Sequence, residues 1–99
     1  MTNDMTAASE AVGHASGLVD TAVAGLAQRA TVNGKISVAA LDRYQVLAYD
    51  LAHAAAAVEG SRVMCRYGEH GELESMLARA YVADALADVV SRIIGRDQL

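Results

Sequence analysis

The sequence predicts an all-α fold, an antiparallel three-helix domain, from three observations. The 99 residues include no proline and 21 alanines, and alanine favours helices and is depleted in strands. Apolar residues make up 54% of the chain, enough to bury a core. Two glycine-containing segments, Asn33-Gly34 and Gly68 to Gly71, divide the chain into three long stretches with helical periodicity. The length corresponds to one domain, residues 1–99.

The first helix is expected over residues 6–31, because apolar residues recur there every seven positions. Gly13, Gly17 and Gly25 weaken this helix by about 1 kcal/mol each relative to alanine. The stripe consists of Val12, Val19 and Leu26, with Ala15, Ala22 and Val23 between them.

The second helix is expected over residues 38–67, with Ser37 as its N-cap. The side opposite its main stripe is also largely apolar between Val46 and Ala57. A helix that is apolar on most sides is either central in a bundle or covered by a partner. The main stripe consists of Leu41, Tyr44, Ala48, Leu51, Ala55, Val58 and Arg62, with Leu47, Ala54 and Ser61 beside it.

The third helix is expected over residues 72–94. Glu72 and Glu74 in its first turn, and Arg92 and Arg96 at its end, suit the helix dipole. Gly95 is the expected C-cap residue. The short connection makes the second and third helices antiparallel neighbours. The expected stripe consists of Leu73, Leu77, Ala80, Ala83, Ala87, Val90 and Ile94.

The alanine-rich core is expected to be thin, because alanine contributes little apolar area and a small domain buries only about 60–68% of its unfolded surface. Small residues compensate in part by letting helices approach closely. We therefore expect the domain to pair into a larger, four-helix-like or six-helix bundle. The partner would be a second copy or the remainder of a larger protein.

Charge and composition exclude several classes. The net charge is −4 and Lys35 is the only lysine, so nucleic-acid binding is not expected. The longest uncharged apolar run, Ala54 to Val58, is far shorter than the roughly 20 residues of a membrane span. Residues 1–10 lack the basic and apolar parts of a secretory signal. Cys65, the single cysteine, suits a reducing compartment, and we expect a cytoplasmic protein.

Two strings of sequence carry a family resemblance. The first is Gln45-Val-Leu-Ala-Tyr-Asp-Leu-Ala52, continuing to Glu59 and Arg62. The second is Ser75-Met-Leu-Ala-Arg-Ala-Tyr-Val-Ala83, continuing to Gly95. Together, over about residues 41–95, they resemble the C-terminal helical bundle of the acyl-CoA dehydrogenases. The resemblance implies a divergent helical piece of a flavoprotein whose family oxidises acyl-CoA thioesters with FAD.

The chain also departs from that family. Of the several glycines in the family's flavin-facing loop only Gly95 remains, followed by Arg96 and Asp97. The Arg and aromatic pair that serves the flavin has no counterpart ahead of Gln45, and no stretch matches the loop of the catalytic Glu. We therefore expect no catalytic, cofactor-binding or metal-binding residue in this chain, and no FAD bound by this chain alone.

Four residues or motifs carry candidate chemistry. Arg62 falls on the apolar stripe of the second helix, and Asp84 lies close to that of the third, so we predict a buried ion pair between them. Asp50-x-x-His53 resembles half of a di-iron motif, but such a site needs a second motif and further carboxylates. A hydrogen bond between Asp50 and His53, or their exposure, is the expected outcome. Cys65 is expected to be a structural thiol.

The function expected from the sequence is packing or assembly within an acyl-CoA dehydrogenase-like protein. The first alternative is a free-standing helical protein that acts in interaction or oligomerisation. The second is a small helical-bundle enzyme with a metal site.

Overall fold

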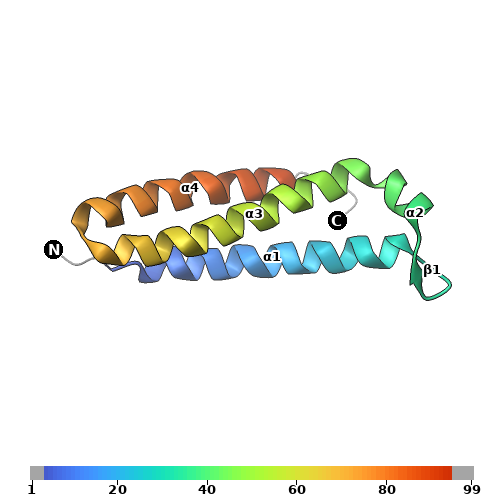
Figure 1. The fold of residues 1–99 in the computed structure, drawn as a ribbon, viewed down its shortest axis with the longest axis horizontal. Coiled ribbons are helices and arrows are strands. Elements are labelled where there is room, and N and C mark those ends of the chain that lie inside the picture. The colour runs from blue at the N-terminus through green and yellow to red at the C-terminus, as the bar shows by residue number, and fades with distance from the viewer. Residues whose placement is uncertain (1–3, 95–99) are drawn as a thin grey trace.

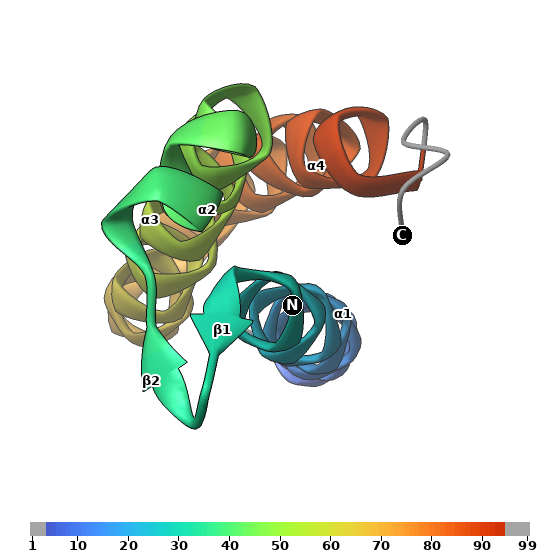
Figure 2. The ribbon, with the colours of Figure 1, turned by 90° about the vertical axis from the view of Figure 1, so that its right-hand side faces the viewer.

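Three long helices, packed antiparallel, form the body of the protein, as the sequence predicts. The computed structural model describes residues 4–94 of the chain. The long helices are α1 (Thr6–Ala30), α3 (Gln45–Tyr67) and α4 (Glu72–Ile94), and they form a rod 55 Å long (Figure 1). Viewed end-on, α1 lies beneath the pair formed by α3 and α4 (Figure 2). Gly95 and Arg96, the expected end of the third helix, lie outside the described residues.

A short β-hairpin follows α1, where only a helix end was expected. Strands β1 (Thr31–Val32) and β2 (Lys35–Ile36) pair antiparallel. Asn33 and Gly34 between them both have positive φ, 53° and 79°. Positive φ at both central residues is the signature of a type I′ turn, and Asn-Gly is its preferred sequence. The Asn-Gly pair, with β-branched Thr31 and Val32 before it and Ile36 after it, was the signal for this hairpin.

The predicted helix over residues 38–67 is wrong in one respect, because it is interrupted at Tyr44. A separate helix, α2 (Val38–Arg43), precedes α3. Ser37 caps α2, since its side chain accepts a hydrogen bond from the Ala40 amide at 3.2 Å. At Tyr44 the backbone leaves the helical region, with φ −111° and ψ 28°. The break turns α2 away from the axis of α3 (Figure 1).

The turn between α3 and α4 closes one end of the bundle. It consists of a 3-10 helix, η1 (Gly68–His70), followed by Gly71. A Cβ at Gly68 would lie 2.8 Å from the Met5 sulfur and 2.9 Å from the Ala78 Cβ. Met5 itself is buried, and its sulfur lies 3.6 Å from the Ser75 hydroxyl. Only glycine therefore leaves room for Met5 to cover this end of the core.

The buried residues agree with the apolar stripe predicted for the first helix, but the stripe predicted for the third helix is wrong. Val12, Ala15, Val19 and Ala22 of α1 are buried, although Val23 is 45% exposed. The expected α4 stripe faces outward instead. Its exposed members are Leu73, Leu77, Ala80, Ala83, Ala87 and Val90. The residues of α4 that are buried are Ser75, Ala78, Val82, Val89 and Ile93.

The reason for this correction is that α4 is apolar on nearly every side, so apolar periodicity does not distinguish its faces. The smaller side chains of Ser75 and Ala78 lie inward because α4 packs closely against α3 and Met5. Among residues 4–94, no helix combines the length and hydropathy needed to cross a membrane.

Candidate interaction surface

Helix α3 carries two parallel rows of residues, both at the spacing of a coiled-coil seam. We call the buried row the inner seam: Leu47, Leu51, Ala54, Val58, Ser61 and Cys65. We call the other row the outer seam: Val46, Tyr49, His53, Ala56, Gly60, Val63 and Tyr67. In both rows the intervals alternate between three and four residues, which is the repeat of helices that pack along their length.

The outer seam has the chemistry of a buried surface but faces solvent. None of its seven positions holds Asp, Glu, Lys or Arg. Val46, Tyr49 and Val63 are 64%, 62% and 54% exposed. The rings of Tyr49 and His53 lie 4.5 Å apart between centroids. An uncharged heptad row about six turns long is typical of a helix with a second neighbour.

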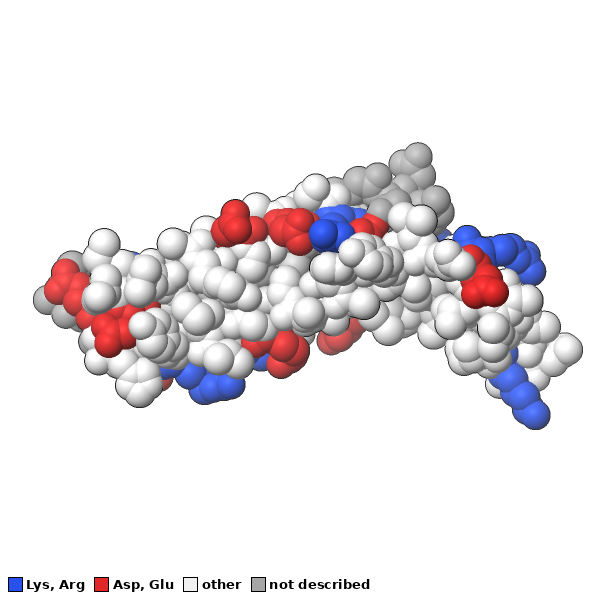
Figure 3. Space-filling model, turned by 45° about the horizontal axis from the view of Figure 1, so that its top comes forward, with Lys and Arg blue, Asp and Glu red and all other residues white. Residues whose placement is uncertain are grey.

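Helix α4 extends this surface. Leu73, Leu77 and Tyr81 are spaced four residues apart, so they form one ridge along α4, and all three are exposed. The Tyr81 hydroxyl lies over Gly60 of the outer seam, 2.5 Å from where a Cβ would be. The ridge and the outer seam are therefore adjacent. Figure 3 shows a largely uncharged face over α3 and α4, with charged side chains mainly towards its edges and ends. We call the outer seam and the ridge together the α3/α4 face.

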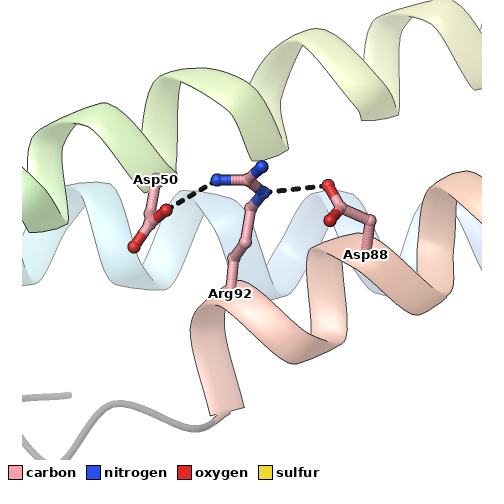
Figure 4. Close-up of polar contacts among 3 residues, drawn as sticks. All are labelled: Asp50, Asp88 and Arg92. Carbon is pink, nitrogen blue, oxygen red and sulfur yellow. Dashed lines mark hydrogen bonds and ion pairs between the residues drawn. The ribbon is translucent and has the colours of Figure 1, made fainter.

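An ion-pair cluster joins α3 to α4 near one end of this face (Figure 4). The Arg92 guanidinium donates to Asp50 of α3 at 2.7 Å and to Asp88 of α4 at 2.9 Å. The Asp50 side chain is only 9% exposed, so the arginine compensates a carboxylate within the core. The sequence offered the signal for this pair, since Asp50 interrupts the inner side of α3 and needs a cation.

The predicted pair of Arg62 and Asp84 does not correspond to the contacts that Arg62 makes. Its guanidinium is bonded to Glu59 on α3 and to the Ser16 hydroxyl on α1, the latter at 2.7 Å. Asp84 is exposed on α4. Ion pairs within residues 4–94 join Glu59 to Arg62, Asp50 to Arg92, and Asp88 to Arg92.

Asp50 and His53 face different surroundings. Asp50 is buried against Arg92, whereas His53 is exposed beside Tyr49. Residues 4–94 bring together no group of three or more His, Cys, Asp or Glu side chains that could hold a metal ion. Of the two expected outcomes, a shared hydrogen bond or exposure, exposure holds for His53 but not for Asp50, which lies in the core.

Cys65 is buried on the inner seam. It borders a hollow of about 280 Å³ between α1 and α3. Arg66 and Glu69 also line this hollow, together with Ser9 of α1. The volume lies just below the range of about 300–1,000 Å³ for small-ligand pockets.

Comparisons with models of protein families, with curated proteins and with solved structures gave no match. The α3/α4 face therefore rests on the geometry of this chain alone. Sequence reasoning noted the apolar far side of the second helix, but it assigned two residues of the ridge, Leu73 and Leu77, to the core.

Proposed function

We propose that the protein is a helical assembly module, and that its α3/α4 face packs against further helices. The observation that carries the proposal is the outer seam, a second uncharged heptad row on a helix that already uses its first row in the core. Exposed apolar patches of this kind mark interaction sites, because leaving them in water costs free energy.

The resemblance to acyl-CoA dehydrogenases supports a more specific form of the proposal. Its two strings fall on α3 and α4, the helices that form the face. In this form, the chain supplies helical packing within an acyl-CoA dehydrogenase-like flavoprotein, whose other parts would bind FAD and the acyl-CoA. No residue of this chain is expected to bind FAD, so we derive no chemical step from this chain.

The general proposal is tested by the native size of the protein in cell extract. We expect an epitope-tagged chain to elute well above its own 10.3 kDa in size-exclusion chromatography. Leu77→Glu should return it to monomer size, because a buried charge without a partner is unfavourable. Elution of the wild-type chain at monomer size would contradict assembly of any kind.

The flavoprotein form has its own test. The purified assembly, including whatever partner co-elutes, would be examined for FAD by absorbance and for oxidation of acyl-CoA thioesters. FAD in that assembly supports the specific form. An assembly without flavin leaves a free-standing interaction protein, the alternative expected from the sequence.

A further inference from the structure

We infer that the partner on the α3/α4 face is a second copy of this chain, related by a twofold axis that runs parallel to the helices. This inference rests on the proposed assembly function and adds the identity and orientation of the partner. In this dimer α3 of each copy packs against α4 of the other.

The area of the face agrees with a dimer. A helix of 23 residues is about 34 Å long, and two neighbouring helices are together about 20 Å wide. The hairpin of α3 and α4 therefore offers about 700 Å² in projection. A stable interface of standard size buries about 800 Å² per partner, so one copy of the same face is enough to cover it.

The distribution of apolar residues selects the orientation. Val63 and Tyr67 of α3 lie at the turn end of the hairpin, next to Leu73 and Leu77 of α4. A twofold axis along the helices keeps the turn ends together, so the apolar end of one copy covers the apolar end of the other. An antiparallel arrangement would place this end against the opposite end of the partner face.

Charge selects the same orientation. Asp84 and Asp88 lie with Tyr81 around one surface hollow of α4, and both are exposed. In an antiparallel dimer α4 would face α4 of the partner, and these carboxylates would approach their own copies. In the parallel dimer they face α3 of the partner, whose outer seam carries no acidic residue.

His53 provides the complementary group. Asp50 of α3 contacts Arg92 of α4, and the two helices run antiparallel. His53 lies three residues after Asp50, and Asp88 lies four residues before Arg92. His53 and Asp88 are therefore at about the same level along the bundle. Exchange of α3 and α4 between copies therefore brings the His53 imidazole of one chain towards Asp88 of the other. An imidazole can donate a hydrogen bond to a carboxylate in either of its protonation states.

The first experiment is sedimentation equilibrium of the purified chain. Wild type is expected at twice the monomer mass of 10.3 kDa. Leu77→Glu should raise the dimer dissociation constant by at least about 30-fold, the effect of a hot-spot residue. Leu18→Glu is the matched control, since Leu18 is 41% exposed but lies on α1, and it should leave the dissociation constant unchanged.

These outcomes separate the inference from the proposed function. A purified wild type that stays monomeric at several hundred micromolar overturns the second copy as partner. If the chain is nevertheless large in extract, the assembly function stands with a different partner. If Leu18→Glu and Leu77→Glu raise the dissociation constant equally while their circular dichroism spectra stay unchanged, the α3/α4 face is not the dimer interface.

The second experiment tests the orientation by disulfide formation in a Cys65→Ala background. Leu77→Cys and His53→Cys both lie on the α3/α4 face, about three helical turns apart along it. A twofold axis that runs along the face between α3 and α4 brings both positions towards their own copies, so each variant should cross-link on oxidation. An antiparallel axis crosses the face at one level, so cross-linking at only one of them overturns the parallel arrangement. Leu18→Cys should remain monomeric.

Discussion

The inner and outer seams of α3 share one helix and one periodicity, yet they differ in what their residues contact. The inner seam is covered by α1 and α4, and its members include Leu51 and Val58. The outer seam holds Tyr49 and Tyr67. Within residues 4–94 Tyr81 lies over its Gly60, and the other six members are exposed. The difference teaches that heptad spacing identifies faces suited to packing, while the rest of the chain decides which face is covered first.

The largest effect is expected on the inner seam. Leu51→Ala should lower the free energy of unfolding by about 2–4 kcal/mol, because it removes buried methyl groups and leaves a cavity. Tyr49→Ala on the outer seam should change it by less than about 0.5 kcal/mol, as for other surface substitutions.

Both variants are to be measured by urea denaturation in the Leu77→Glu background, so that association does not contribute. Equal losses for Leu51→Ala and Tyr49→Ala would show that the two seams are not different in their coverage within one chain.

An intermediate loss in the free energy of unfolding is expected at the ion pair between Asp50, on the inner side of α3, and Arg92. Arg92→Ala leaves the Asp50 carboxylate without its guanidinium partner in a site that is 9% exposed. We expect a loss of about 2 kcal/mol, the range for hydrogen bonds to charged groups. Arg79→Ala, an exposed arginine of the same helix, is the control and should lose little. The free energy of unfolding at neutral pH distinguishes the two variants.

The smallest effect is expected away from both seams, at the start of α1. The Thr6 hydroxyl and amide donate hydrogen bonds to the Asp4 carboxylate and hold its pKa below the ordinary value of 3.8. A lowered pKa in the folded state stabilises the fold above pH 4, and this contribution disappears as the pH falls through the lowered pKa.

The hydroxyl is the main cause of this shift, so Thr6→Val should move the pKa of Asp4 back towards 3.8. A two-dimensional NMR titration of the Asp4 side chain measures it. An unchanged pKa of Asp4 in Thr6→Val would contradict the hydroxyl as the cause of the shift. The substitution lies away from the inner and outer seams, so the packing of their residues should not change.

Much of the fold was predictable from local signals. The bounds of α1 and α4, the Ser37 cap and the turn at Gly68 follow from periodicity, capping chemistry and glycine placement. The orientation of α4 was not predictable in this way. Leu77 looks like a core residue by hydropathy, but Ser75 and Ala78 are the ones that fit the close approach of α4 to the rest of the bundle.

The ion pairs illustrate a second limit. Placing Arg62 and Asp84 on facing stripes assumed the helix rotations, and an error of one residue moves a side chain by 100° around its helix. The pair of Asp50 and Arg92 forms instead, because these two side chains flank the true contact between α3 and α4. The β-hairpin at Asn33 was overlooked since its two strands are only two residues each.

The turn from Gly68 to Gly71 also has a consequence for how the chain folds. Four residues connect the two helices with the most extensive mutual packing, so closing this hairpin costs little loop entropy. Chains dominated by such local contacts fold within microseconds to milliseconds. We expect the α3–α4 hairpin to form first and α1 to dock onto it, with Met5 as the last residue to seal the end of the core.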